Sequence, residues 1–253
     1  MQNEDILVVM QKDLERALKA PEKNRRWAML IDLRKCVGCH ACTVGCVSEN
    51  KLPPGMYYRP VHEYEQGKYP KVSRTFLPRP CMQCDNPPCV TACPVKGKDG
   101  ATWKSTEGLS AGLVMINYEQ CIGCGACVPA CPYDARTMDQ GGMHGDGTPA
   151  IQKYETMASY EYGKKWPRSG KDTPVGNARK CHFCLHRLAV GQLPMCITTC
   201  IGRSGYFGDE NDPQSLIAQV KKANKVQVLK PAKKTTPRVY YIATEKLEVL
   251  YGK

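Results

Sequence analysis

An α+β fold built from two small cysteine-rich modules, one nested within the other, is the architecture that this 253-residue sequence predicts. Three observations lead to it. Sixteen residues are Cys, and they fall into four groups of four along the chain. Short apolar runs typical of β-strands lead into the first and third groups. The chain has only three Phe and a mean hydropathy of -0.45, which indicates that something besides apolar side chains fills part of the interior.

The third cysteine group has the most informative spacing. Cys121, Cys124, Cys127 and Cys131, followed by Pro132, form the pattern Cys-x2-Cys-x2-Cys-x3-Cys-Pro, which binds 4Fe-4S clusters in bacterial ferredoxins. Three thiolates close together hold three irons of one cluster, and small residues such as Gly123 and Gly125 let the backbone wrap around it. The fourth Cys of such a motif ligates a second cluster, so the pattern predicts a partner motif elsewhere in the chain.

The other three groups vary this pattern. The first keeps the spacing but has Val47 in place of the proline. The second has four residues between its second and third ligands, two of them prolines that stiffen the extra turn. The fourth has eleven residues at that position. The ligands are Cys36, Cys39, Cys42 and Cys46 in the first group, Cys81, Cys84, Cys89 and Cys93 in the second, and Cys181, Cys184, Cys196 and Cys200 in the fourth. Sixteen thiolates taken in fours predict four 4Fe-4S clusters.

The crossover of each fourth Cys leaves the choice of partner group open. The second and third groups share the proline and lie close in sequence, so we pair them, and the first and fourth groups then enclose them. Sequential pairing, first with second and third with fourth, obeys the same rule and remains the alternative. The predicted ligand sets are Cys36, Cys39, Cys42 and Cys200 for cluster 1; Cys46, Cys181, Cys184 and Cys196 for cluster 2; Cys81, Cys84, Cys89 and Cys131 for cluster 3; and Cys93, Cys121, Cys124 and Cys127 for cluster 4.

This pairing predicts two bacterial-ferredoxin-like dicluster modules with loop insertions and terminal extensions. The inner module spans 81–132, and the outer module comprises 25–80 and 133–245. A helical extension, 1–24, precedes them and a tail, 246–253, follows. The outer module carries an insertion at 138–178 that is rich in aromatic residues. Because loops of this length are usually functional or disordered and aromatic residues argue against disorder, we expect an ordered segment that lies against another subunit.

Local patterns predict the elements around the cysteines. An amphipathic helix ends near Pro21 and packs either on its own module or on another subunit. Strands are expected at 27–32, 113–117 and 238–242, and a helix begins near Pro213. Residues 50–78 predict a loop with one extended hairpin, whose tyrosines are half-buried anchors rather than partner contacts.

Two other uses of sixteen cysteines fit less well. Secreted disulfide frameworks are usually far smaller and carry signal peptides. Zinc-binding nucleic-acid modules supply separated Cys-x2-Cys pairs, not triplets followed by Cys-Pro. The net charge of +12 is also a weak nucleic-acid signal, because four clusters at roughly -2 each would reduce it to about +4.

The sequence shows neither an apolar run of membrane-span length nor an export signal. No stretch approaches the roughly 20 apolar residues of a membrane span. Arg25-Arg26 resembles a twin-arginine signal, but the apolar run behind it, 27–31, is too short to serve as one. We expect no direct membrane span and no nucleic-acid partner.

Taken together, the four groups resemble a known family. Their order, the widened second and fourth groups, and the runs Cys181-His182-Phe183-Cys184-Leu185-His186-Arg187 and Cys200-Ile201-Gly202-Arg203 are similar to the four-cluster iron–sulfur electron-transfer subunit of dimethyl-sulfoxide-reductase-family complexes, such as polysulfide, tetrathionate, thiosulfate and arsenate reductases. The resemblance covers about residues 25–245. It implies a catalytic partner with a molybdopterin cofactor and usually a polytopic membrane subunit that handles quinone or quinol. The nested pairing agrees with that family.

The implied function is relay of single electrons between the membrane subunit, or another redox donor, and the catalytic subunit, with no bond chemistry in this chain. A stand-alone polyferredoxin carrier is the alternative. The resemblance implies a membrane-associated complex, at the periplasmic face by co-export with a partner or on the cytoplasmic side.

Seven residues beside the ligands are candidates for tuning the clusters. His40, His182 and His186 either tune or couple protons, or merely pack or donate a hydrogen bond. The cations Lys35, Arg179, Lys180 and Arg203 either raise nearby reduction potentials or only neutralise thiolates.

Overall fold

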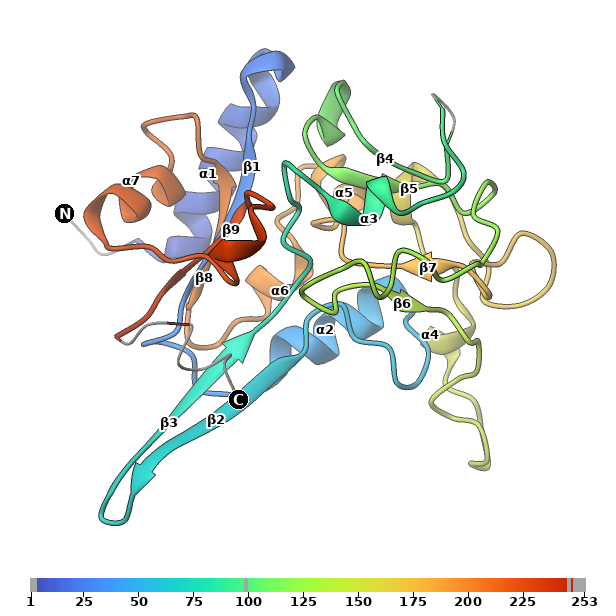
Figure 1. Ribbon diagram of the computed structural model, residues 1–253, viewed down its shortest axis with the longest axis horizontal. Helices are drawn as coiled ribbons and strands as arrows, with labels where there is room; N and C mark the ends of the chain where they lie inside the picture. The colour runs from blue at the N-terminus through green and yellow to red at the C-terminus, as the bar shows by residue number, and fades with distance from the viewer. Residues whose placement is uncertain (1–3, 98–99, 245–246, 248–253) are drawn as a thin grey trace.

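The central sheet joins three segments that lie far apart in the sequence. The computed structural model describes residues 4–97, 100–244 and 247. In it, β1 (Trp27–Asp32) lies between β8 (Gly205–Asp209), which is antiparallel to it, and β9 (Val239–Ile242), which is parallel (Figure 1). Trp27 pairs with Asp209, and Met29 pairs with both Phe207 and Val239. The strands predicted at 27–32 and 238–242 are therefore confirmed.

Two helices cover one side of this sheet. α1 (Ile6–Lys19) begins after Asp5, whose side chain accepts a hydrogen bond from the Leu7 N–H, and a 3-10 turn, η1 (Glu22–Asn24), follows it. Its buried residues Met10, Leu14 and Ala17 face the sheet, and α7 (Leu216–Ala223) lies on the same side (Figure 1). The N-terminal helix thus packs on its own chain, which was one of the two predicted possibilities.

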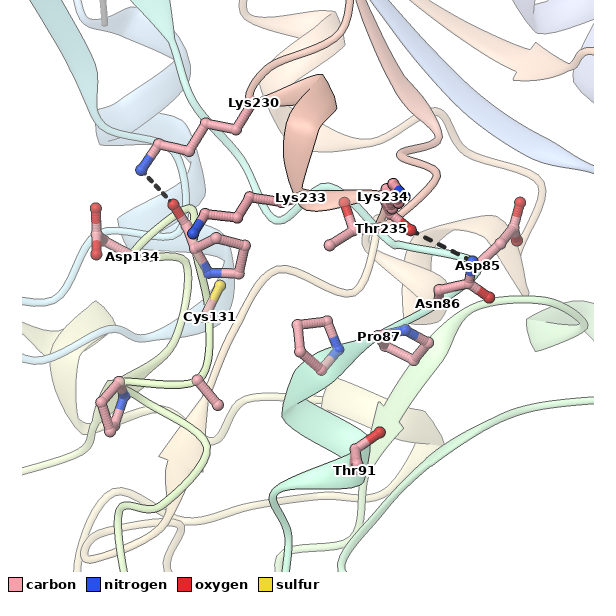
Figure 2. Close-up of a pocket in the computed structure, with 14 residues that line it drawn as sticks. Asp85, Asn86, Pro87, Thr91, Cys131, Asp134, Lys230, Lys233, Lys234 and Thr235 are labelled. Carbon is pink, nitrogen blue, oxygen red and sulfur yellow. Dashed lines mark hydrogen bonds between the residues drawn. The ribbon is translucent and has the colours of Figure 1, made fainter. Parts of the chain in front are cut away.

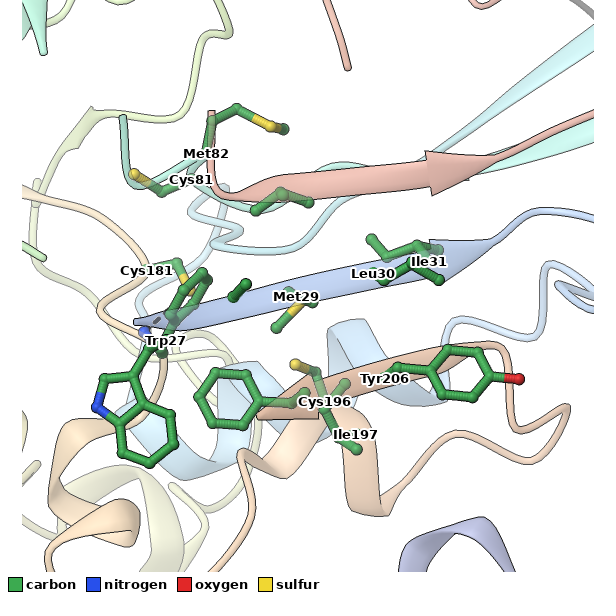
Figure 3. Close-up of a cluster of buried hydrophobic side chains, with 14 of the residues drawn as sticks. Trp27, Met29, Leu30, Ile31, Cys81, Met82, Cys181, Cys196, Ile197 and Tyr206 are labelled. Carbon is green, nitrogen blue, oxygen red and sulfur yellow. Dashed lines mark hydrogen bonds between the residues drawn. The ribbon is translucent and has the colours of Figure 1, made fainter. Parts of the chain in front are cut away.

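The core combines apolar side chains with cysteines. All six residues of β1 are buried, and the Trp27 and Phe207 rings stack 5.5 Å apart. Figure 3 shows the sulfurs of Cys81, Cys181 and Cys196 among the apolar side chains of the same cluster. Cysteines of the second and fourth groups therefore share the main core with apolar side chains, as the low Phe content predicts.

A long hairpin projects from the body of the protein. β2 (Val61–Lys68) and β3 (Lys71–Pro78) pair along their whole length, from Val61 with Pro78 to Lys68 with Lys71 (Figure 1). The hairpin predicted within 50–78 is confirmed. Its tyrosines differ in role, because Tyr58 at the base is buried while Tyr69 at the tip is 93% exposed.

The other half of the chain has smaller elements. α3 (Pro88–Thr91) precedes β4 (Thr102–Lys104), which pairs with β5 (Val114–Ile116) across the 3-10 turn η2 (Gly108–Ser110). β5 confirms the strand predicted at 113–117. β6 (Thr137–Met138) pairs with β7 (Ala178–Arg179), and the two strands close the loop that contains the insertion.

The insertion contains short elements of its own, and its predicted contact with another subunit stays a prediction. It contains α4 (Lys153–Thr156) and the 3-10 turn η3 (Glu161–Gly163). Ser159 and Trp166 exchange backbone hydrogen bonds, and the Trp166 indole N–H donates to the carbonyl of Glu161. Within the part of the chain that the structure describes, each helix is too short or too polar to traverse a bilayer.

Candidate cluster-binding sites

The first Cys-x2-Cys pair of each group has the same backbone conformation. The residue before the second Cys is left-handed in every group: Gly38 at φ 67°, Gln83 at 46°, Gly123 at 69° and Phe183 at 57°. Glycine adopts this conformation freely, whereas other residues lose roughly 1–2 kcal/mol. The second and fourth groups adopt it without glycine, so the shared turn persists where the sequence does not favour it.

Helix packing and strand pairing bring the first and fourth groups together. α2 (Ala41–Asn50) carries Cys42 and Cys46 and packs on α6 (Met195–Thr198), which carries Cys196. The contact is close, since a Cβ on Gly45 would lie 3.0 Å from Thr199. The antiparallel β1–β8 pair places the chain after β1, which leads to Cys36, beside the chain before β8, which follows Cys200.

Three cavities are each lined by four cysteines. The first holds the thiols predicted for cluster 1, the second those predicted for cluster 2, and the third those predicted for cluster 4. They are Cys36, Cys39, Cys42 and Cys200; Cys46, Cys181, Cys184 and Cys196; and Cys93, Cys121, Cys124 and Cys127.

The remaining four cysteines also lie together. Burial raises the pKa of the Cys84 thiol to about 12, and Cys81, Cys89 and Cys131 contribute to the rise as neighbouring thiolates. Cys131 also lies in the wall of an open groove beside Lys230 and Lys233 (Figure 2). Lys230 donates a hydrogen bond to the carbonyl of Pro132, which fixes the chain directly after Cys131.

The chemistry of these sites suits iron–sulfur clusters. None of the sixteen thiols forms a disulfide. Burial raises the pKa of Cys46 and Cys184 well above the ordinary value, so iron coordination is needed to hold them as thiolates. Backbone N–H groups also point at ligand sulfurs, with Ser204 N 3.3 Å from Cys200 Sγ and Phe183 N 3.4 Å from Cys181 Sγ. Such N–H donors to sulfur are typical of cluster sites.

Exposure differs between the sites. Cys39 of the cluster 1 set and Cys124 of the cluster 4 set are exposed. All four cysteines of the cluster 2 set are buried, and three of the four in the cluster 3 set are buried. Exposed apolar residues flank the two accessible sites, with Val37 58% exposed and Ile122 67% exposed.

The three histidines occupy different environments. His40 is exposed at the start of α2. His186 lies in α5 (Leu185–Leu188), where its Nε2 is 2.7 Å from Glu49 Oε1. His182 lies 3.7 Å from Glu161 Oε1 but is fully buried, and burial lowers its pKa well below the ordinary value. Its ring packs edge-on against the rings of Tyr162 and His186, and a role in tuning a cluster stays a prediction.

Two of the four predicted cations have carboxylate partners instead of thiolates. Arg179 is fully buried and pairs with Asp139 and Glu161. Arg203 pairs with Asp5 at 2.9 Å at the surface and donates to the carbonyl of Cys200. Their main partners are therefore carboxylates, although the charge of Arg203 also acts on the Cys200 thiolate, and their effect on the clusters stays a prediction. Lys35 donates to the Tyr206 hydroxyl at 2.6 Å, whereas Lys180 is buried against the cysteines.

Sequence reasoning missed two arginines that touch the cysteine sets. Arg59 lines the cavities of both the cluster 1 and the cluster 2 thiols. Arg136 lines the cavity of the cluster 4 thiols. Neither lies within a cysteine motif, so no local pattern singles them out.

Comparison with known proteins agrees with this geometry. Residues 72–146 match a family model described as a 4Fe-4S dicluster domain, and residues 120–203 match a second model with the same description. The two matches share the third cysteine group. The chain is therefore a protein of the four-cluster 4Fe-4S class, with two ferredoxin-like dicluster domains and sixteen cysteines.

Proteins of similar sequence show which family within this class the chain belongs to. The chain is 53% identical to the B subunit of selenate reductase from Mesobacillus selenatarsenatis, over 96% of this chain and 80% of that protein. It is 37% identical to the B subunit of tetrathionate reductase from Salmonella typhimurium, over 87% and 73% of the two chains. It is 34% identical to the arsenate respiratory reductase iron–sulfur subunit of Shewanella sp., over 89% and 100%. The chain belongs to the family of iron–sulfur electron-transfer subunits of molybdopterin reductase complexes.

Membership of this family decides between the functional alternatives. It favours a subunit that works with a catalytic partner over a stand-alone polyferredoxin or a zinc-binding nucleic-acid module. The cofactors are four 4Fe-4S clusters.

Proposed function

We propose that single electrons pass along the four clusters in the order 1, 2, 3, 4, each held by the nested ligand set given above. The observation that carries this proposal is that three separate cavities are each lined by four cysteines of one nested set. Sequential pairing would instead place Cys93 with the first group, but Cys93 lines a cavity with three cysteines of the third group.

Contacts between the sets support the order. Clusters 1 and 2 share α2, which supplies Cys42 to one and Cys46 to the other. Between clusters 2 and 3, the Gln83 side chain donates a hydrogen bond to the carbonyl of Cys181 at 2.7 Å. Clusters 3 and 4 share the short segment from Cys89 to Cys93.

The domain boundaries follow from the same arrangement. We propose an inner module of 81–132 within an outer module of 25–80 and 133–245. The β8–β1–β9 sheet supports this division, because it joins segments from both sides of the inner module. The family model that spans 120–203 crosses the proposed boundary at 132, so the boundary depends on the cysteine geometry.

A set of serine variants tests the ligand sets. In the reduced complex, Cys36→Ser and Cys200→Ser should each alter the same cluster signal in electron paramagnetic resonance, and the double variant should alter no further signal. Sequential pairing predicts instead that Cys200→Ser alters the signal that Cys121→Ser alters. That result would overturn the nested sets.

We also propose that the exposed ends of the relay face two partners: the catalytic subunit and a quinone- or quinol-handling membrane subunit. The exposed Cys39 and Cys124, each beside an exposed apolar residue, support contacts at clusters 1 and 4. The insertion at 138–178 supports a further contact, since it exposes Ile151, Tyr154, Met157 and Tyr160. Such apolar and aromatic side chains are enriched at protein interfaces.

The location and substrate of the complex complete the proposal. We place the complex at the membrane, on the periplasmic face by co-export with its partner, and we propose that its catalytic subunit reduces an oxyanion, with selenate the first candidate because of the 53% identity. Purification of the native complex should yield this chain with a molybdenum subunit. Adding selenate, tetrathionate or arsenate to the reduced complex should reoxidise the clusters with only the true substrate. Elution of this chain alone would overturn the partner assignment.

A further inference from the structure

Three buried cations beside the cysteine sets have no carboxylate partner among the described residues. They are Arg59, Lys180 and Arg136, with exposed fractions of 2%, 0% and 3%. Arg59 Nη1 contacts the Met29 sulfur at 2.9 Å, Lys180 donates to the carbonyl of Cys181, and Arg136 donates to the Thr102 hydroxyl. These neutral contacts orient the three side chains but do not balance their charges.

Arg59 lies between the first two thiol sets. It lines both of their cavities. Its charge acts on Cys196 of the cluster 2 set and on Cys42 of the cluster 1 set. Cys36 and Cys46, one from each set, also feel its charge.

Arg136 lies between the last two thiol sets. It lines the cavity of the cluster 4 thiols and acts on Cys127 there. Its charge also acts on Cys81 and Cys89, which belong to the cluster 3 set.

Lys180 lies between the middle two thiol sets. It precedes Cys181 of the cluster 2 set and donates a hydrogen bond to the carbonyl of Cys181. Burial lowers the pKa of Lys180, but the thiolates of Cys81 and Cys89 from the cluster 3 set and of Cys181 favour its charged form. Each pair of consecutive sets thus has one buried cation between its members.

An unpaired buried charge costs several kcal/mol, so a compensating negative charge has to lie nearby. The cluster and its thiolates supply that charge on both sides of each cation. An added electron makes a cluster more negative, and a cation in a region of low dielectric favours that state. A cation between two clusters favours the reduced state of both.

We propose that Arg59, Lys180 and Arg136 are buried positive charges, one between each pair of consecutive clusters, and that each raises the reduction potentials of both clusters beside it. This inference rests on the proposed ligand sets and their order. Arg59 raises clusters 1 and 2, Lys180 raises clusters 2 and 3, and Arg136 raises clusters 3 and 4. The three cations therefore favour electron occupancy along the whole line rather than at one cluster.

The test is a redox titration of the complete complex, followed by electron paramagnetic resonance, in Arg59→Met, Lys180→Met and Arg136→Met variants. Arg59→Met should lower two of the four midpoint potentials, and Arg136→Met should lower the other two. Lys180→Met should lower one member of each pair. Arg59→Lys, Arg136→Lys and Lys180→Arg keep the charge and should keep potentials near those of the wild type.

Arg203→Gln is the matched control. Arg203 lies beside Cys200, but it is only half-buried and is paired with Asp5, so its loss should change the potential of cluster 1 far less than Arg59→Met does. Loss of clusters only in the Met variants would support the need for charge. The proposal would be overturned if a Met variant moved a single potential, if Arg59→Met and Arg136→Met moved the same two, if the charge-keeping variants shifted as far as the Met variants, or if both kinds of variant lost their clusters.

The serine variants described above test the ligand sets independently. If the serine variants confirm the ligand sets but the Met variants do not shift the midpoint potentials in pairs, only the shared role of the cations is wrong. If the serine variants contradict the ligand sets, the proposed order of electron transfer through the clusters is wrong as well.

Discussion

Asp85 connects the two halves of the protein through one carboxylate. Its oxygens lie 2.6 Å from Arg26 Nη2, 2.7 Å from Lys104 Nζ and 2.8 Å from Arg238 Nη2. Arg26 and Arg238 directly precede β1 and β9, whereas Lys104 ends β4. Asp85→Asn keeps the shape of the side chain and removes its charge, so it tests whether this contact stabilises the fold.

The burial of Asp85 determines how much stability the Asp85→Asn substitution should cost. Breaking a fully buried ion pair costs about 3–5 kcal/mol, and exposed pairs contribute about 0–1 kcal/mol. The Asp85 side chain is 22% exposed, so the substitution should cost about 2–3 kcal/mol. For a chain of this length, each kcal/mol corresponds to about 2–4 °C in Tm, which gives a fall of about 4–12 °C.

The measurement is thermal unfolding of the iron-replete protein under argon, followed by circular dichroism. Glu119→Gln is the control, because Glu119 pairs with Lys164 at 2.8 Å where both side chains are more than half exposed. It should change Tm far less than Asp85→Asn. Equal shifts in the two variants would refute the argument that Asp85 joins the two halves.

Three further predictions concern charge and cofactor. Burial alone would raise the pKa of Asp85, but hydrogen bonds from Arg26, Lys104 and Arg238 hold it well below the ordinary value. The ionised Asp85 carboxylate therefore stabilises the fold fully above about pH 4, and this stabilisation is lost only as pH falls further. The difference in Tm between wild type and Asp85→Asn should stay constant from pH 8 to pH 5. A difference that shrinks in that range contradicts the low pKa. Arg179→Met should cost about 3–5 kcal/mol in urea unfolding, because it leaves Asp139 and Glu161 buried with lost partners, and a cost under about 1 kcal/mol would contradict the pairing. Removal of iron by a chelator should abolish the cooperative thermal transition, since ligand cysteines lie in the main apolar core, and an unchanged transition would show that the clusters do not support the fold.

Local patterns predicted the elements that depend on local physics. The apolar spacing of α1, the buried run of β1 and the hairpin of β2 and β3 are all readable from a few neighbouring residues. β8 was not predicted, because its sequence contains two glycines, which weaken a strand. The fold requires them: a Cβ on Gly205 would lie 2.8 Å from Ile197 Cδ1, and one on Gly208 would lie 3.3 Å from Ile217.

The cysteine positions were equally readable, but their electrostatic surroundings were not. Motif spacing identified all sixteen candidate ligands, whereas Arg59 and Arg136 reach the cysteines only through tertiary packing. Arg179 illustrates the opposite error. It lies beside Lys180 and Cys181 in sequence, yet its guanidinium points to Asp139 and Glu161, which come from the insertion and its edge.

The β8–β1–β9 sheet has a consequence for biosynthesis. β1 leaves the ribosome long before either of its neighbours, and at roughly 5–20 residues per second the interval before β8 is translated is on the order of ten seconds. During that time Cys36, Cys39 and Cys42 have no Cys200 beside them, whereas residues 81–132 are already translated. The four cysteines of the cluster 1 set therefore come together only late in translation, after the whole of residues 81–132 has left the ribosome.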